Sequence, residues 1–392
     1  MCILAFHKCQ YNIYRKGLRM INIDVLGELS NAFGPCGFED EVALTIARHS
    51  NKMKVTNDSM GNVYMELENN TGKRPRVMID CHMDECAYMI QAILPNGLLS
   101  ILTLGGIHLT CMPGHGVIVK NQFGDKYRGI LTTKPVHFMN AAQKMNTSLD
   151  IENIYIDLGA SCREEIVKEY KICVGDTAVP DTKFFFDEKR QMCIGKAFDN
   201  RLGCAGVLET MKRLNEETCL PVDVIAAFAT QEELGGRGAA VTVQNVKPDV
   251  VIVFEGTPAD DPYYPAGTAQ GALRQGVQIR HIDSGYLSQF EFIRFAHKIG
   301  ELHGVKYQDA VRRGSFTNAS SIGLLGKGVP ILVLGLPARY VHSHYNFCYV
   351  SDIEETIKLA INIIKNLSNE NLDTIYRKNL LNCKCSITEC LE

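Results

Sequence analysis

The chain of 392 residues contains no apolar run that approaches the ~20 residues needed to span a membrane. Its charge is nearly balanced, with 41 Lys and Arg against 44 Asp and Glu. Nothing therefore indicates a nucleic-acid partner or an anionic membrane surface. Residues 1–19 are basic but lack a long apolar core and a small-residue cleavage site, so they do not resemble a signal peptide. We expect residues 1–19 to be an N-terminal extension or a wrongly assigned start.

Cysteine is frequent, but its pattern is not that of a disulfide scaffold. The number, 15, is odd, and the residues are scattered through a long chain. Reduced thiols in a cytoplasmic protein fit this usage better. Residues 371–392 are expected to be a C-terminal tail, whose cysteines could bind a metal but lack a convincing fourth ligand. Those tail cysteines are Cys383, Cys385 and Cys390.

Hydrophobic periodicity predicts an α/β protein with a mixed sheet flanked by helices. With 46% hydrophobic residues the chain can bury one core and a second, smaller one. Buried strands and amphipathic helices alternate through residues 20–87 and 179–370, which we expect to form one discontinuous domain. The predicted strands are 58–67, 76–81, 222–229, 249–254, 276–282 and 330–336. The predicted helices are 21–33, 39–50, a helix that follows residues 198–203 and runs to about 216, 238–246, 287–303 and 352–367.

Residues 88–178 have a different hydrophobic pattern from the rest of the chain. Short, partly alternating runs are interrupted by Gly and Pro, and long helical patterns are scarce. This pattern predicts an inserted, small β-rich domain. Its histidines, His108, His115 and His137, have no evident partner in the sequence, so we expect them to be structural or surface residues.

Two adjacent acids follow the predicted strand 222–229. Glu232 and Glu233 precede Gly235 and Gly236, just beyond the point where α/β proteins place their chemistry. One carboxylate can ligate a metal while its neighbour acts as a general base. The alternative is a solvated acidic loop.

Three other strands also end in candidate metal ligands. His82 follows the strand 76–81, and Asp84 lies close enough in sequence to orient its imidazole. Glu255 follows the strand 249–254, and His342 follows the strand 330–336. Asp199 heads a helix beside them, where it could be an N-cap or a bridging carboxylate. Two histidines with several carboxylates suit two divalent ions, zinc first, with cobalt or manganese as alternatives.

These stretches resemble the glutamyl-aminopeptidase/tetrahedral-aminopeptidase (TET) family of dinuclear zinc metallopeptidases, some members of which are called endoglucanases or FrvX-like. Their order and spacing fit the family over about residues 20–370. The matching segments are G-P-C-G-F-E-D-E-V (34–42), D-C-H-M-D-E (80–85), K-A-F-D-N-R-L-G (196–203), T-Q-E-E-L-G-G-R-G-A (230–239) and R-Y-V-H-S (339–343).

The resemblance implies a zinc-exopeptidase-like fold, with the inserted domain of PDZ or barrel type. It also implies a role for each site residue. His82 and Glu255 would hold one metal, Glu233 and His342 the other, and Asp199 would bridge both. Asp84 would orient His82, and Glu232 would be the general base.

The implied activity is that of a cytoplasmic metallo-aminopeptidase that acts on short peptides. The resemblance also implies assembly as a homo-oligomer, with a dodecamer as the form that the family suggests. Other readings stay open: a metal-dependent amidohydrolase or deacylase on the same scaffold, or a non-catalytic relative. A glycosidase is disfavoured, because glycoside hydrolysis ordinarily uses paired carboxylates without His ligands.

Two positions depart from the family pattern. Glu255 and Asn318 stand where many relatives have Asp. We expect Glu255 to affect metal spacing and Asn318 to affect substrate contacts. Asp260 and Asp261 could compensate or be ordinary loop acids. Four arginines could favour acidic substrates, but salt-bridged surface positions are the commoner reading. They are Arg274, Arg280, Arg312 and Arg313.

Overall fold

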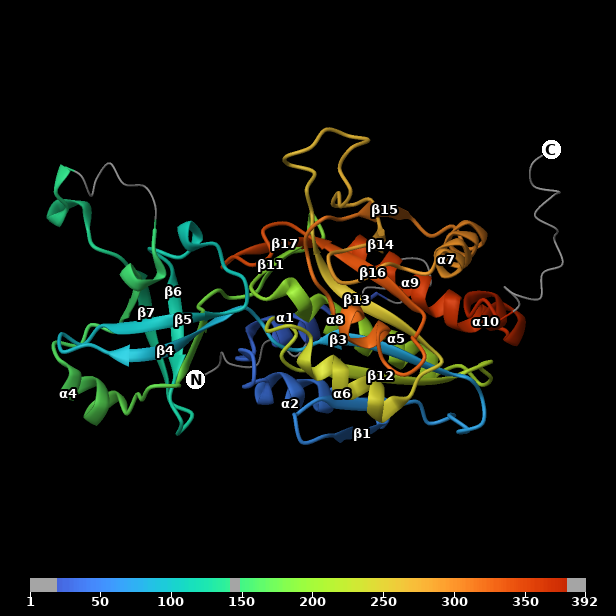
Figure 1. Ribbon diagram of the computed structural model, residues 1–392, viewed down its shortest axis with the longest axis horizontal. Helices are drawn as coiled ribbons and strands as arrows, with labels where there is room; N and C mark the ends of the chain where they lie inside the picture. The colour runs from blue at the N-terminus through green and yellow to red at the C-terminus, as the bar shows by residue number, and fades with distance from the viewer. Residues whose placement is uncertain (1–19, 142–148, 379–392) are drawn as a thin grey trace, which may run out of the picture.

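The computed structural model describes residues 20–141 and 149–378 (Figure 1). The predicted N-terminal extension and the three tail cysteines lie outside these ranges. The described chain forms a larger α/β lobe and a smaller β lobe, which stand side by side in Figure 1. No helix in the described ranges is long and apolar enough to cross a membrane.

The larger lobe is built on an eight-stranded mixed sheet of order β1-β2-β12-β3-β13-β16-β14-β15. The central strands β12, β3, β13 and β16 run parallel, whereas β2 and β14 are antiparallel to their central neighbours. Central parallel strands end at one edge, so residues beyond them can meet in one crevice. The strands are β1 (Lys54–Asn57), β2 (Val63–Glu66), β3 (Arg76–His82), β12 (Asp223–Ala229), β13 (Val250–Pro258), β14 (Val277–Ile282), β15 (Tyr307–Val311) and β16 (Ile331–Ala338).

Side chains alternate between the two faces of this sheet. In β13, Val250, Ile252 and Phe254 join the core formed with α1, α5, α7 and α9, while Val251 and Val253 pack with α6 and α8. Burial on both faces explains why the central strands read as continuous apolar runs. The helices are α1 (Ile23–Asn31), α2 (Asp40–Arg48), α4 (Arg163–Glu165), α5 (Phe198–Asn215), α6 (Arg237–Val246), α7 (Phe290–Leu302), α8 (Asn318–Gly323), α9 (Val350–Asn366) and α10 (Asn369–Ile375).

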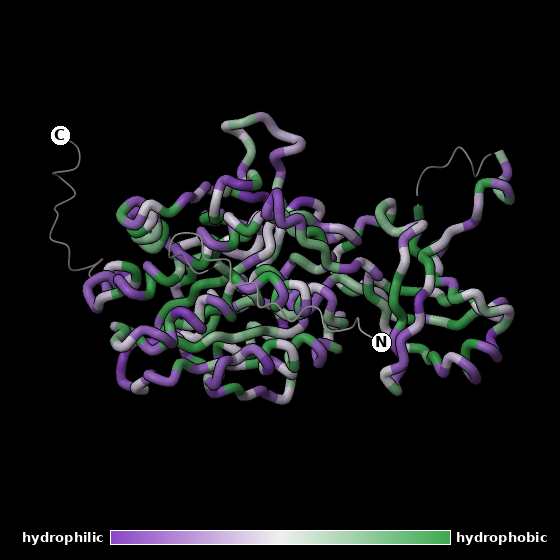
Figure 2. The backbone as a smooth tube through the Cα atoms, turned by 180° about the vertical axis from the view of Figure 1, so that it is seen from behind, coloured by the Kyte–Doolittle hydropathy of each residue, from purple (hydrophilic) through white to green (hydrophobic). Residues whose placement is uncertain are grey.

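The smaller lobe is a closed six-stranded barrel of order β4-β5-β8-β7-β6-β9. It has its own apolar core, which includes Tyr88, Ile101, Val119, Leu131 and Ile156. Figure 2 shows hydrophobic segments running through both lobes. The strands are β4 (Ala87–Ile93), β5 (Leu99–Leu104), β6 (Gly116–Lys120), β7 (Lys126–Thr132), β8 (Tyr155–Asp157) and β9 (Thr177–Pro180).

The predicted fold class is confirmed by the mixed sheet, its flanking helices and the closed barrel. A small antiparallel sheet of order β10-β11-β17, which was not predicted from the sequence, lies within the larger lobe. Its last strand begins just after His342 and His344. The strands are β10 (Phe185–Asp187), β11 (Met192–Gly195) and β17 (Asn346–Tyr349).

Candidate metal centre

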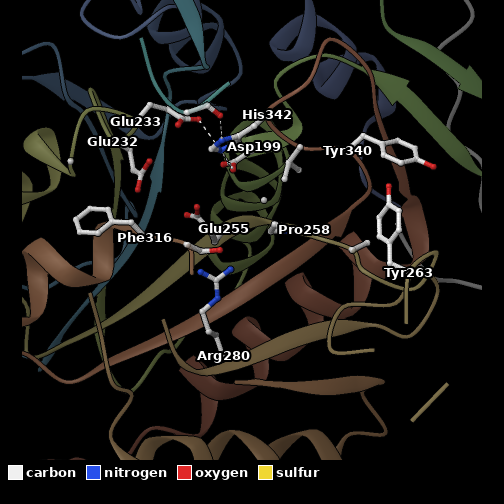
Figure 3. Close-up of a pocket in the computed structure, with 16 residues that line it drawn as sticks. Asp199, Glu232, Glu233, Glu255, Pro258, Tyr263, Arg280, Phe316, Tyr340 and His342 are labelled. Atoms are coloured by element: carbon white, nitrogen blue, oxygen red, sulfur yellow. Dashed lines mark hydrogen bonds and ion pairs between the residues drawn. The ribbon is translucent and has the colours of Figure 1, made fainter. Parts of the chain in front are cut away.

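Five of the predicted site residues line a cavity of about 650 Å³ at the edge where the central strands end (Figure 3): Asp199, Glu232, Glu233, Glu255 and His342. His82 and Asp84 are fully buried behind its wall. His82 is the last residue of β3, and Glu232 and Glu233 lie in the turn between β12 and α6. His342 comes from the loop that follows β16. Asp199 comes from the first turn of α5.

The predicted position of Glu255 at the end of a strand is wrong in detail. β13 continues to Pro258, because Glu255 to Pro258 pair with Gly335 to Ala338 of β16. Glu255 is therefore held inside a strand and is 3% exposed. A carboxylate on a strand interior is fixed more firmly than one on a loop.

Asp199 lies between the two histidines. Its Oδ1 is 2.9 Å from His82 Nε2, and its Oδ2 is 3.2 Å from His342 Nε2. Its carboxylate accepts none of the backbone N–H hydrogen bonds found in the first turn of α5, where Asn200 Oδ1 accepts from the N–H of Gly203 at 3.0 Å instead. Of the two readings of Asp199, the structure disfavours the N-cap. A carboxylate that faces a different imidazole with each oxygen has the geometry of a bridge.

Each histidine has a second partner on its other ring nitrogen. His82 Nδ1 is 3.2 Å from Asp84 Oδ1, with the geometry of an ion pair rather than of an aligned hydrogen bond. His342 Nδ1 lies 2.7 Å from the carbonyl oxygen of Gly106, in the segment between β5 and β6. Such partners fix the ring orientation of metal-ligating imidazoles. Gly106 could not be identified from the sequence, because no pattern links it to His342.

Asp84 also orders the acidic turn. Its two carboxylate oxygens accept hydrogen bonds from the backbone N–H groups of Glu232 and Glu233 at 2.9 and 3.0 Å. Burial raises the pKa of Asp84, but its contacts with His82, the thiol of Cys36 and these N–H groups outweigh burial and lower it. Asp84 thus remains ionised and holds both glutamates and His82 in place.

At the cavity, two groups of side chains bring their ligand atoms within 4.8 Å of one another. One contains His82, Asp199 and Glu255, and the other contains Glu233, His342 and the thiol of Cys86. Cys86 was not among the predicted residues. The sequence offered a signal, since it follows Glu85 in the D-C-H-M-D-E segment, but a lone cysteine there has no pattern that marks a ligand.

The electrostatics of the cavity favour cations. Burial raises the pKa of Glu233 to about 7 and raises the pKa values of Glu232 and Glu255 well above the ordinary range. Oε1 of Glu232 and Oε1 of Glu233 are buried without a hydrogen-bond partner. Buried carboxylates this close are costly to ionise unless a cation neutralises them. The residues present therefore fit divalent metal ions.

The histidines show the complementary effect. Burial lowers the pKa of His342, but contacts with Asp199 and Glu233 outweigh burial and raise it to about 10. His82 behaves in the same way, with Asp199 and Asp84 as its partners. In the protein alone, protonated imidazoles thus supply the positive charge. Metal ions would replace those protons and leave the imidazoles neutral.

Glu232 differs from the other acids, since it belongs to neither group of convergent ligand atoms. Its Oε2 is 3.9 Å from His82 Nε2, and its side chain points into the cavity beside Glu233 (Figure 3). It is 6% exposed. A carboxylate beside a ligand cluster, but free of it, can exchange a proton with a reacting group.

The side chain of Asn200 holds Glu255 and its strand in position. Its Nδ2 donates to the carbonyl oxygen of Phe254 at 2.8 Å and lies 3.3 Å from Glu255 Oε2. Its Oδ1 accepts from the N–H groups of Gly203 and Gly256, both at 3.0 Å. The amide thereby ties α5 to β13 at the level of the site. This role was missed in the sequence because it depends on a contact across 55 residues.

The two family departures lie in different surroundings. Asn318 is fully buried, and its Nδ2 donates to Asp80 Oδ1 at 2.7 Å. It is not among the residues that line the cavity, so direct substrate contact is not supported, and an effect on substrate contacts stays a prediction. An aspartate there would place two buried carboxylates together, whereas the amide supplies a donor. Glu255, in contrast, is part of the ligand cluster.

Arg280 is not a surface arginine. It is 1% exposed and lines the cavity, where it points toward Glu255 (Figure 3). Its charge opposes the effect of burial on the pKa of Glu255. The loop acids are paired: Asp260 with Arg312, at 3.3 Å, and Asp261 with Arg339. Asp260 and Asp261 are therefore ordinary loop acids.

Comparison with known proteins extends the likeness over most of the chain. The model of a family described as M42 glutamyl aminopeptidase matches residues 61–359. The glutamyl aminopeptidase of Lactococcus lactis is 28% identical over 81% of this chain and 88% of its own length. A TET aminopeptidase from a marine sediment thaumarchaeon has a TM-score of 0.85 at 29% identity, covering 90% of this chain and 99% of its own. The structure described as a PhTET1 dodecamer has a TM-score of 0.77 at 25% identity, covering 88% and 99%.

Proposed function

Because the chain belongs to the M42 glutamyl aminopeptidase family of peptidases, we propose that it is an aminopeptidase with two divalent metal ions in each subunit. The observation that carries this proposal is the position of Asp199 between His82 and His342. Each histidine has a further carboxylate beside it, Glu255 for His82 and Glu233 for His342. This arrangement gives two neighbouring ligand sets that share one aspartate.

The ligand atoms favour zinc. Each set offers one imidazole nitrogen and carboxylate oxygens, which suits Zn²⁺, with cobalt or manganese as alternatives. When bound, such ions lower the pKa of a coordinated water and polarise a carbonyl oxygen. Glu255 would complete the set at His82 and Glu233 the set at His342. Asp84 and the carbonyl of Gly106 would hold the two imidazoles in ligating orientation.

Glu232 is the proposed general base. It would take a proton from the attacking water and pass it to the leaving amine of the peptide. Burial favours its protonated form, and the positive charge of bound ions would return it to the ionised form that accepts a proton. Arg280 at the cavity wall limits the accumulated negative charge near Glu255.

The substrate is a short peptide with a free N-terminus. A cavity of about 650 Å³ holds a few residues at most. Its acidic groups would attract the α-ammonium group of the substrate. Tyr263 and Tyr340 lie at one side of the cavity and Phe316 at another (Figure 3). All three are more than 40% exposed, so they can contact the residues of the peptide that extend outward.

The proposal includes self-assembly and a cytoplasmic location. A similar structure is described as a dodecamer, and the TET1 peptidase of Pyrococcus horikoshii is said to assemble into a tetrahedron or an octahedral shell. We propose a homo-oligomer of the same kind for this chain. The cysteines within the described residues are all free, which agrees with a reducing compartment.

A substrate panel tests the proposed activity. Metal-stripped and zinc-reconstituted enzyme would be assayed on aminoacyl anilides, on short free peptides and on the same compounds with an N-acetyl group. We expect release of free N-terminal residues only from the unblocked compounds and only after reconstitution. Preferential turnover of the N-acylated compounds would instead identify a deacylase.

A further inference from the structure

A third group of convergent ligands lies outside the cavity, at the edge of the sheet opposite to β1. It consists of His281 on β14, His297 on α7 and Asp309 on β15. Nε2 of His281 is 2.7 Å from Asp309 Oδ1, and Nε2 of His297 is 2.8 Å from the same oxygen. None of these residues lines the catalytic cavity.

The fold explains why the three side chains meet. β14 and β15 pair in parallel, with Ile279 opposite Asp309, and the register shifts between Arg280 and Ile282. Successive side chains of a strand point to opposite faces, so Arg280 lines the cavity while His281 lies on the same face as Ile279, which packs in the core with α7. Figure 1 shows α7 beside β15 at the end of the sheet.

His297 is held in position by its own surroundings. It lies on α7 between Ile293 and Ala296, which are buried in the core, and the more exposed residues of the helix. Its ring stacks on Tyr307 of β15, with centroids 5.1 Å apart and an angle of 16° between the planes. The ring is therefore aimed at Asp309 by packing as well as by hydrogen bonding.

We propose that His281, His297 and Asp309 form a zinc site that is separate from the catalytic centre. Two imidazole nitrogens and one carboxylate oxygen are three ligands of the kind that zinc prefers, and a water molecule can complete the tetrahedron. The side chains are 32%, 28% and 46% exposed, so an ion can reach them from solvent. Zinc would replace the hydrogen-bonded protons between the rings and Asp309.

The position of the site suggests what a bound ion does. β15 is the last strand of the sheet, and its outer edge has no partner strand among the described residues. The three ligands come from β15, from the neighbouring strand β14 and from the covering helix α7. A bound ion therefore clamps the edge strand to the body of the sheet and to its helix.

The first test measures how many zinc ions the full-length protein binds per subunit. Zinc is supplied in an amount that matches the number of proposed sites rather than in excess. Wild type would be compared with His297→Asn and Asp309→Asn, and with His303→Asn as the control, since His303 lies at the end of the same helix outside the triad. We expect the first two variants to bind one ion fewer per subunit than wild type and the control, with turnover of free peptides retained. Equal zinc content in all four proteins would overturn the proposal.

A second measurement covers the case in which a variant fails to fold. Crystals of wild-type protein grown with stoichiometric zinc would be measured at the zinc absorption edge. We expect an anomalous peak within bonding distance of His281 Nε2, His297 Nε2 and Asp309 Oδ1. Ordered side chains without such a peak would show that the triad is only hydrogen-bonded. Peaks in the catalytic cavity are counted separately. The absence of zinc from His281, His297 and Asp309 can therefore be distinguished from its absence from the cavity.

Discussion

At the scale of single residues, the site depends on one carboxylate that faces two imidazoles. Asp199 is fixed by its place at the start of α5, next to Asn200, which is bonded to β13. Glu232 lies in the same cavity but outside both groups of convergent ligand atoms. We therefore propose separable roles for the two residues, with Asp199 in metal ligation and Glu232 in proton transfer.

The Glu232→Gln variant tests this separation. The amide has nearly the same shape but cannot accept a proton as a general base, so we expect kcat to fall by about 10²–10⁴-fold while metal content is unchanged. Steady-state turnover of an unblocked peptide and elemental analysis measure both quantities. Glu291→Gln, at a half-buried acid on α7 that lies outside the cavity, should leave both unchanged. Near-normal turnover by Glu232→Gln would remove Glu232 from the base role.

At the scale of elements, a buried ionic network joins β3 to α5. Lys196 Nζ contacts both oxygens of Glu85 at 2.6 and 2.7 Å, and Arg201 Nη2 lies 3.1 Å from Glu85 Oε1. Arg201 also donates to the carbonyl oxygens of Met83 and Gly34. This network fixes the segment that carries His82 and Asp84 relative to the turn that carries Asp199.

Removing Glu85 should be costly. Glu85→Ala leaves Lys196 and Arg201 buried without their anion, and we expect a loss of about 3–5 kcal/mol in the free energy of unfolding. The matched control is Glu66→Ala, which breaks the exposed pair with Lys54 and should cost less than about 1 kcal/mol. Urea unfolding of the metal-free proteins measures the difference. Similar losses in both variants would contradict a structural role for the network.

Asp352 gives a pH-dependent prediction for the start of α9. Burial outweighs the hydrogen bonds from the N–H groups of Arg274 and Gly276 and raises its pKa from 3.8 to about 6. An acid whose pKa is raised by folding stabilises the fold below its unfolded pKa, near 4, and loses that contribution as the pH rises through about 6. A difference of this size corresponds to at most about 3 kcal/mol.

The comparison is between wild type and Asp352→Asn, unfolded in urea between pH 4 and 7 with a chelator present. We expect the stability of wild type relative to the variant to decrease as the pH rises across this range. Titration of the acids in the cavity is common to both proteins and cancels in the difference. Parallel pH profiles would show that the pKa of Asp352 is not raised.

Most of the helices and strands could be predicted from the sequence, but few of the contacts between segments far apart in the chain could be. Apolar runs of strand length identified the central strands, because burial on both faces leaves an unbroken pattern. The ligands that follow those strands were visible for the same reason. Asn200, Gly106 and the cavity position of Arg280 were not, since each depends on a contact between segments far apart in sequence. The meeting of His281, His297 and Asp309 likewise depends on contacts between β14, β15 and α7.

At the scale of the whole molecule, both lobes contribute residues to the proposed metal site. The α/β lobe supplies the proposed metal ligands, and the barrel side supplies the carbonyl of Gly106 that holds His342. We expect the subunits to assemble into a dodecamer, with twelve times the subunit mass of 43.6 kDa. Light scattering coupled to size-exclusion chromatography measures this mass at neutral pH. A particle of one subunit would contradict the proposed assembly.

The most direct test of the dinuclear aminopeptidase is a zinc titration of metal-stripped protein with an unblocked short peptide as substrate. It would be performed on wild type and on His297→Asn, so that an ion bound by His281, His297 and Asp309 is not counted with those of the cavity. For the variant, we expect no release of free amino acids without metal and a plateau close to two zinc ions per subunit. Full turnover by the stripped protein, or none after two ions are bound, would contradict the proposal.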